Sequence, residues 1–322
     1  MVRGGSPYVP PRVAVEAEEV VYEYVPPQNG AGPMWARGSS ALVRSGDALF
    51  VTGIKTLPDA KPLNNVVPVI YQRLPHGWEA VYEGQERTRE PSPLAAFDDG
   101  RLFLSINPTL TPPDAYNGPS EPRILEFDMS SPRAGYRTLL PEWDGKPAFT
   151  EHSYRSLAAD SRNGELILFQ NVEYTHAEWA FLDRGGRWHS GKLKFPWGKE
   201  YDEPGPVRIA YPPVALKDRA VYFFGVSDVL EPNLVWRRRK RELTGREWDY
   251  DFRRLFLTWS DDITTGKFHL WLEIATRDAT AGWLTPWDLH VDDRGYVHLL
   301  WTERALDERL RPEFFPLERQ TF

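Results

Sequence analysis

The chain repeats one pattern of apolar and polar positions five times: a short apolar run, a polar turn with Asp or Gly, and a stronger apolar run. The second run of each unit is β-branched or aromatic, which predicts a β-strand. Turn sequences such as D-D-G, N-G and D-R-G are typical of tight β-hairpins. The five predicted hairpins begin at Ala41, Pro93, Ser156, Pro213 and Asp288.

The hairpins are regularly spaced. Their turns fall at Gly46, Gly100, Gly164, Asp218 and Gly295, so one unit takes roughly 60 residues. Runs such as EPRILEFD, EWAFLDRGGRWH and GKFHLWLEIAT lie between the hairpins and supply further strands. Four-stranded units at this spacing are typical of β-propellers. We therefore predict an all-β propeller of four-stranded blades, with five blades visible and room for up to seven.

The whole chain, residues 1 to 322, is predicted to be a single propeller domain in which the N-terminal strand EEVVYEYVP closes the ring. With 29 Pro and 24 Gly distributed along the sequence, no helix of conventional length is expected. Only TERALDERLRPEF, from Thr302, has the pattern of one or two helical turns. The basic run WRRRKRE, from Trp236, is interpreted as a charged outer edge, or as a contact for an acidic polymer.

Composition narrows the function classes. The net charge of −7 argues against nucleic acid as a partner, and the absence of any run of 18 apolar residues argues against a membrane span. No signal peptide is visible, and we expect a soluble protein. The chain has no Cys, and it carries no pattern typical of a metal, phosphate or dinucleotide site, so neither a metal nor a cofactor is predicted. The 13 Trp, 14 Tyr and 16 Phe provide ring faces on which a flat ligand can pack.

Residues just before the first strand of each blade are expected to line one mouth of the central channel. Counting back five positions from each first strand gives Arg37, Arg89 and His152, with Arg208 one position away from a fourth site. Arginine suits bidentate capture of a carboxylate or sulfate group. An acidic oligosaccharide or polysaccharide is therefore the predicted ligand.

Several motifs resemble a known superfamily. SDDITTGKFHLW, from Ser260, resembles a loosened aspartate box, the turn that joins the outer strands of sialidase-type blades. The chain as a whole resembles the BNR-repeat, sialidase-like β-propellers, nearest the group of polysaccharide lyases that includes the ulvan lyases. His152, His176 and Tyr211, which precedes a proline, correspond to three elements of that group. The group has an arginine about sixteen positions after the tyrosine, where this chain has Ser227 and Asp228.

The resemblance implies cleavage of a uronate-containing polymer by β-elimination. That reaction needs a cation for the carboxylate, a base for the neighbouring proton and an acid for the leaving oxygen. The carboxylate is assigned to Arg37 and Arg208. His152 and His176 share the base and orienting roles, and Tyr211 acts as acid or base. Tyr154 occupies an equivalent blade position and is the alternative phenol.

Two other functions remain open at this stage. A glycoside hydrolase needs a pair of carboxyl groups about 5 to 10 Å apart, for which Asp228 and Glu231 are the first candidates and Asp249 and Asp251 the second. A non-catalytic glycan-binding propeller needs no acid or base. The fold cannot distinguish these functions, because propellers have many activities.

Overall fold

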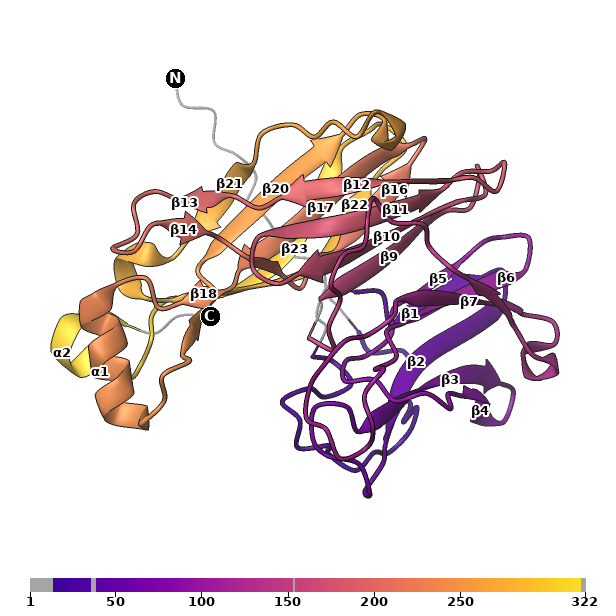
Figure 1. Cartoon of the computed structure of the whole chain (residues 1–322), viewed down its shortest axis with the longest axis horizontal. Coiled ribbons are helices and arrows are strands. Elements are labelled where there is room, and N and C mark those ends of the chain that lie inside the picture. Colours follow the sequence, from indigo (N-terminus) through magenta and orange to yellow (C-terminus); the bar gives the residue numbers. More distant parts are fainter. Residues whose placement is uncertain (1–13, 36–38, 153, 320–322) are drawn as a thin grey trace.

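A computed structural model of the chain describes residues 14–35, 39–152 and 154–319. All five predicted hairpins are present in it (Figure 1). Four of them are extended by further strands into antiparallel sheets, the blades, and the fifth stands as a pair of strands that we call the half blade. The predicted all-β propeller is therefore confirmed, and the described residues contain no further blade.

The strands of blades one to four follow each other in sequence from the inside of the ring outward. Blade one contains β1 (Leu42–Ser45), β2 (Ala48–Thr56), β3 (Val66–Leu74) and β4 (Gly77–Glu83). Blade two contains β5 (Leu94–Ala96), β6 (Arg101–Ile106), β7 (Arg123–Asp128) and β8 (Arg137–Leu139). Blade three contains β9 (Arg155–Asp160), β10 (Glu165–Val172), β11 (His176–Leu182) and β12 (Trp188–Lys194). Blade four contains β15 (Ile209–Ala210), β16 (Val214–Lys217), β17 (Ala220–Ser227), β20 (Arg254–Ser260) and β21 (Leu272–Thr276).

The half blade consists of β22 (Trp283–Val291) and β23 (Val297–Arg304). A short pair, β13 (Trp197–Gly198) and β14 (Gly205–Pro206), lies between blades three and four in sequence. Three turns of 3-10 helix occur at Pro132–Ala134, Ile263–Thr265 and Asp278–Thr280. The second of these belongs to the aspartate-box-like segment, which joins β20 to β21, the outer strands of blade four.

A helical excursion leaves blade four between β17 and β20. It consists of β18 (Val229–Leu230), helix α1 (Leu234–Thr244) and β19 (Tyr250–Asp251), and it lies at the opposite end of the molecule from blade one (Figure 1). The expectation of no conventional helix was wrong here. Asn233 caps α1 by accepting hydrogen bonds from two backbone amides, and Gly245 ends it with a φ of 66°. These caps make WRRRKRE a helix and not an edge strand.

The innermost strands stand around a common axis. Neighbours along the series β1, β5, β9, β16 and β22 contact each other, and all five strands line one central cavity of about 750 Å³. Apolar clusters fill the spaces between adjacent blades. Phe50 and Leu104 lie between blades one and two, Leu157 between two and three, Phe169 and Phe223 between three and four, and Phe224 and Leu289 between four and the half blade. Each blade is thus held by its neighbours, as expected of a propeller.

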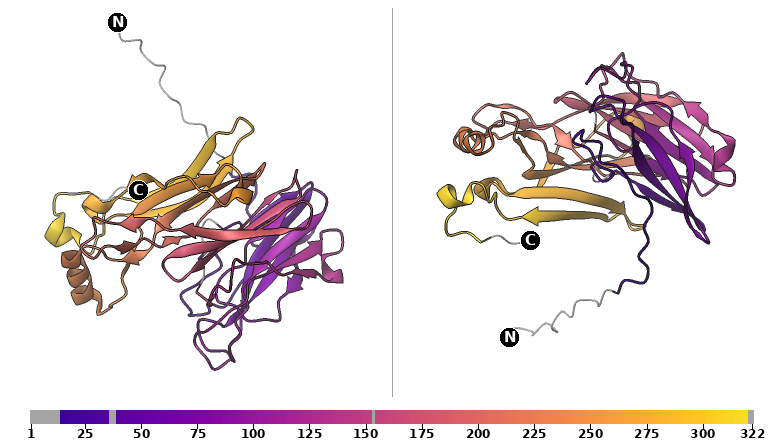
Figure 2. Two further views of the ribbon diagram at one scale, coloured as in Figure 1. Left: turned by 45° about the horizontal axis from the view of Figure 1, so that its top comes forward. Right: turned by 90° about the horizontal axis from the view of Figure 1, so that it is seen from below.

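The two ends of the series meet across a cavity and not across a packed interface. That cavity, of about 620 Å³, is lined by Val51 and Thr52 of blade one and by Trp287 of the half blade. The N-terminal segment also lines it but forms no strand within residues 14–35; Tyr22 stacks on Tyr71 of blade one at 4.7 Å. In place of the expected closing strand on the last blade, the segment is therefore a packed extension of the first. Figure 2 shows the half blade in yellow and the first blade in indigo and purple.

The start of blade four depends on a close approach that only glycine permits. A Cβ atom at Gly225 of β17 would overlap the Ile209 side chain and lie 3.0 Å from the carbonyl oxygen of Ala210. We expect Gly225→Ala to lower the free energy of unfolding by about 1–3 kcal/mol, as overpacking does in other cores. Gly205→Ala is the matched control, because nothing lies within 4 Å of its Cβ position. Urea unfolding of both variants tests this, and equal midpoints would contradict it.

No helix in the described ranges is long and apolar enough to cross a membrane.

Candidate functional site

The candidate site lies where the innermost strands begin. A cavity of about 340 Å³ is bordered there by residues at or just before those strands, including Ser40, Ser92, Ser156, Pro213 and Asp288. Residues shortly before these positions in the sequence are therefore carried to the same mouth of the channel. None of His152, Tyr154 and Arg208 lines this cavity, but contacts join the three: the Tyr154 ring lies 5.2 Å from the His152 ring and 5.4 Å from the Arg208 guanidinium.

His152 is held by a buried carboxylate. Its Nδ1 lies 3.2 Å from Oε1 of Glu90, whose side chain is 1% exposed, while the imidazole itself is 26% exposed. Arg155 contacts the same carboxylate at 3.7 Å, and burial lowers the pKa of this arginine to about 10. Within the described chain, Nε2 of His152 makes no hydrogen bond. An imidazole with one nitrogen fixed and the other directed elsewhere is suited to proton transfer.

Aromatic rings surround His152. Its ring centroid lies 5.7 Å from that of Trp35 and 5.2 Å from that of Tyr154. Tyr154 and Tyr211 meet edge to face at 4.8 Å, and Tyr211 stacks on Phe252 at 5.6 Å. Both tyrosines are buried, at 4% and 8% exposed. Trp35, Tyr154, Tyr211 and Phe252 thus form an aromatic cluster, largely buried, to which the N-terminal segment and blades three and four contribute.

Tyr211 stands at a break in the inner strand of blade four. Its φ is +50°, a left-handed conformation that an aromatic residue rarely adopts, and Pro212 follows it. The break separates β15 from β16, although both pair with β17. Residues in such sparsely populated conformations concentrate at functional sites. The Tyr-Pro motif therefore marks a local distortion as well as a place in the sequence.

Arg208 and Asp228 form a buried pair beneath the rings. The Arg208 Nη2 lies 2.6 Å from Oδ2 of Asp228, and the two side chains are 3% and 1% exposed. Burial raises the pKa of Asp228, and the charge of Arg208 opposes that rise. Tyr154 also hydrogen-bonds to this carboxylate, and burial raises the pKa of Tyr154 well above its ordinary value. Tyr154 is therefore a neutral donor, and the charge of Arg208 is balanced inside the protein.

Two further tyrosines belong to the site but were missed from the sequence. The Arg208 guanidinium lies 4.0 Å from the ring centroid of Tyr174 and 5.3 Å from that of Tyr250. The two hydroxyls are 3.0 Å apart, and burial, followed by the bond to Tyr174, raises the pKa of Tyr250 to about 12. Tyr174 is 44% exposed. Tyr174 therefore has a phenol at the surface. Its position two residues before the predicted site residue His176 is the feature of the sequence that could have indicated it.

His176 lies apart from this cluster. It is the first residue of β11, its Nδ1 is 2.7 Å from Oγ1 of Thr175, and its Nε2 is 3.2 Å from Oε1 of the buried Glu178. Lys192 contacts the same carboxylate at 3.2 Å. None of these contacts joins His176 to His152, Tyr211 or Arg208. His176 is linked to the cluster through Thr175, which follows Tyr174 in the chain.

The two remaining predicted arginines are Arg89 and Arg37. The guanidinium of Arg89 lies 5.5 Å from the ring centroid of Trp35, and its Nη2 donates a hydrogen bond of 3.4 Å to the carbonyl of Asn29. In the described residues it pairs with no carboxylate, so its charge is available to a ligand. Arg37 lies outside the described residues.

Glu231 is placed in a separate ion network. Its side chain is fully buried and contacts Lys240 of α1 at 2.6 Å and Arg253 at 2.9 Å. Asp251 contacts the same Arg253 at 2.6 Å, and burial raises its pKa well above the ordinary range. Asp249, the other reserve carboxylate, pairs with Arg309 at 2.9 Å. These carboxylates hold the helical excursion against the propeller.

The described residues contain no group of three or more His, Asp or Glu side chains arranged to hold a metal ion.

Solved structures similar to this chain include proteins of several activities. An ulvan lyase of polysaccharide lyase family 25, bound to -[GlcA(1-4)Rha3S]-, is 11% identical with a TM-score of 0.49, and the match covers 82% of this chain and 63% of that one. The α-L-arabinofuranosidase of glycoside hydrolase family 93 from Fusarium graminearum, with arabinobiose, is 13% identical with a TM-score of 0.47, covering 82% and 79%. The Trypanosoma rangeli sialidase is 9% identical with a TM-score of 0.45, covering 84% and 44%.

The chain spans about 63% of the length of that lyase. Its sequence matches no family profile and no curated protein. The activity of this chain has to be inferred from its own residues.

Proposed function

We propose that the protein is a carbohydrate-active propeller that binds an acidic polysaccharide at the mouth of its channel and cleaves it by β-elimination. The observation that carries this proposal is the carboxylate-held imidazole of His152, 26% exposed, beside the half-buried ring of Trp35, which Arg89 also contacts. Aromatic faces suit sugar rings, and an arginine without a carboxylate partner suits an anionic substituent.

The proposed reaction assigns one role to each group. Nε2 of His152 removes the proton from the carbon beside the uronate carboxylate, and Glu90 stabilises the imidazolium that forms. The electron pair forms a carbon–carbon double bond as the bond to the leaving oxygen breaks. Arg89 binds the carboxylate, with Arg37 as a second candidate from the sequence. The charge of Arg208 is balanced by Asp228, so this arginine supports the rings from below.

The leaving oxygen needs a proton from a phenol near the surface. Tyr211 is the donor expected from the sequence, but its side chain is buried and packs against Trp35. We assign the proton to Tyr174, which is 44% exposed and shares a hydrogen bond with Tyr250. Tyr211 and Tyr154 then form the floor of the site. His176 positions the Tyr174 loop through its contact with Thr175.

The decisive experiment incubates the purified protein with a panel of uronate polymers. β-Elimination produces an unsaturated sugar that absorbs ultraviolet light where the intact polymer does not. Growth of that absorbance together with chain shortening is the expected result. If no polymer of the panel yields the absorbance, the lyase proposal fails.

A glycoside hydrolase is the second candidate, because Asp228 has a raised pKa and a hydrogen-bonded tyrosine beside it. A hydrolase would release reducing ends from the panel without the ultraviolet absorbance. The two carboxylates first considered for it do not act together, since Glu231 is fully buried against Lys240 and Arg253. A binding propeller would release neither product and would keep its affinity after replacement of His152.

A further inference from the structure

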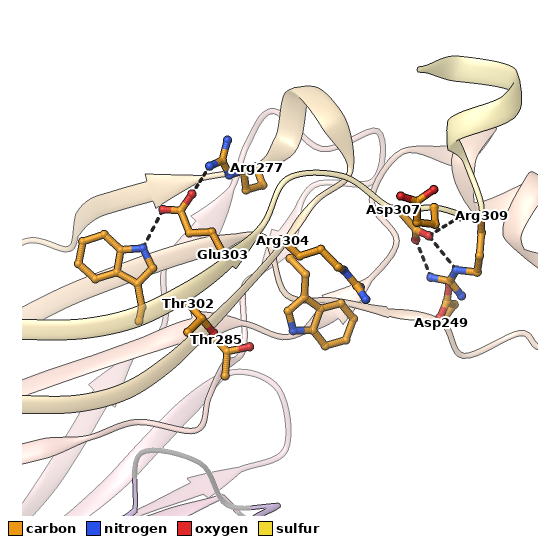
Figure 3. A pocket seen from close by; sticks show the side chains of 11 residues that line it. Asp249, Arg277, Thr285, Thr302, Glu303, Arg304, Asp307 and Arg309 are labelled. Carbon is orange, nitrogen blue, oxygen red and sulfur yellow. Dashed lines mark hydrogen bonds and ion pairs between the residues drawn. The ribbon is translucent and has the colours of Figure 1, made fainter. Parts of the chain in front are cut away.

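A second large cavity adjoins the half blade. It has a volume of about 1170 Å³, and its lining includes Trp283, Thr285, Thr302 and Arg304 of β22 and β23 (Figure 3). The facing wall is formed by residues around the helical excursion and the segment before α2 (Arg311–Phe314), among them Arg309. None of these residues belongs to the site at the channel mouth.

Each acidic group of this cavity contacts a cation, although two of them share one arginine. Glu303 pairs with Arg277, and Asp307 lies 2.6 Å from Arg309, which also reaches Asp249. Glu308 lies 3.3 Å from Arg311. Figure 3 shows these pairs as dashed lines on either side of Arg304, except for the last. Lys240 also lies 3.4 Å from Asp307. The carboxylates are therefore engaged by other cations, and within the described residues none of them forms an ion pair with Arg304.

Arg304 is the cation of this lining that lacks an ion pair in the described part of the chain. Its Nε is buried and makes no hydrogen bond there. The guanidinium lies 5.3 Å from the ring centroid of Trp283. Thr285 and Thr302 are paired across the two strands beside it and add hydroxyl groups. A guanidinium on an aromatic face with hydroxyls nearby is suited to a carboxylate-bearing sugar.

Aromatic contacts connect this cavity to the channel mouth. Trp283 lies 4.5 Å from Phe252, and Phe252 lies 5.6 Å from Tyr211 of the candidate site. Asp249 lines the second cavity, while its neighbour Tyr250 contacts Arg208 in the site. A chain of ring contacts, from Trp283 through Phe252 to Tyr211, thus joins the second cavity to the candidate site, so the two regions lie next to each other in the molecule.

We propose that this cavity is a second subsite, in which Arg304 binds the carboxylate of a uronate residue several sugars away from the one held at the channel mouth. The inference rests on the proposed function for the identity of the ligand. The subsite would increase affinity for long acidic chains and leave the cleavage step unchanged.

The test compares Arg304→Gln with Arg294→Gln, an equal loss of charge at the exposed tip of the same hairpin. Each variant is run through native gels containing polygalacturonate, with dextran gels as the neutral reference. We expect Arg304→Gln to weaken retardation by polygalacturonate about tenfold, the loss typical of one charge-assisted bond, and Arg294→Gln to match the wild type. Arg304→Lys should recover part of the affinity, and thermal melting checks that all variants are folded.

Affinity and cleavage report on the two proposals separately. Loss of retardation in Arg304→Gln supports the subsite even if the protein cleaves no polymer. Where the wild type does cleave, the variant should raise KM for the polymer and keep kcat. Equal retardation of wild type and Arg304→Gln, equal losses in both glutamine variants, or a wild type that polygalacturonate does not retard would each overturn the subsite.

Discussion

Replacement of His152 by glutamine is expected to slow cleavage of the acidic polysaccharide by about 10²- to 10⁴-fold, the usual contribution of a positioned acid or base. The imidazole of His152 is ionisable, and the buried carboxylate of Glu90, 3.2 Å from Nδ1, fixes its orientation. Glutamine preserves a polar side chain but cannot take up the proton. Because the imidazole is partly exposed, the free energy of unfolding should change little.

His298→Gln is the matched control for this variant. That histidine also contacts a carboxylate, Asp292 at 3.1 Å, but it lies on the exposed surface of the half blade. Initial rates from ultraviolet absorbance and melting temperatures should be measured for both. Retention of more than half of the wild-type rate in His152→Gln would remove the imidazole from the mechanism.

Replacement of Glu231 by glutamine is expected to lower the free energy of unfolding by about 3–5 kcal/mol, because it leaves buried cations without their partner. Lys240 is 3% exposed and Arg253 is 2% exposed, and both contact this carboxylate. At a temperature where the variant is folded, KM should stay near the wild-type value. The sequence predicted Glu231 as a carboxylate acting on the substrate, so separate measurements of stability and KM discriminate that role from a structural one.

Glu242→Gln provides the reference for that experiment. Its carboxylate lies 3.3 Å from Arg239 on the exposed face of the same helix and is 55% exposed. Exposed pairs of this kind contribute at most about 1 kcal/mol. In urea unfolding, the loss of free energy of unfolding in Glu231→Gln should therefore be several times the loss in Glu242→Gln. If Glu231→Gln unfolds like Glu242→Gln and raises KM, the carboxylate belongs to a binding site.

The blades were predictable because each hairpin carries its own signal. Tight turns at Gly46, Gly100 and Gly164 need a positive φ, and glycine supplies it in each case. Helix α1 was not predicted, because its run of arginines was interpreted as a charged edge while the capping residues Asn233 and Gly245 were overlooked. The excursion that carries it also explains the longest spacing between two hairpins.

One part of the candidate site was predictable, namely the residues whose location depends on their position along a blade. His152, Tyr154 and Arg208 come together because each stands just before an inner strand, and Asp228 follows β17 directly. Glu90 was not predicted, since nothing in a single loop reveals that its carboxylate meets an imidazole 62 residues away.

Tyr174, Tyr250 and Trp35 were missed for a related reason. They lie outside the regular blade pattern, and their rings converge only through the packing of loops from different blades. Asp228 and Glu231 are neighbours in sequence, but one pairs with Arg208 and the other with Lys240. Sequence proximity did not show that the two side chains belong to different clusters.

The unequal pairing of strands has a consequence for how the molecule opens. In the described chain β23 pairs with β22 alone, whereas β10 is paired on both sides, with β9 and β11. Amide protons on the outer side of β23 should therefore exchange with deuterium long before those of β10. Local opening at such an edge needs less free energy than global unfolding. The half blade would then be the first unit to separate, while blades one to four keep their protection.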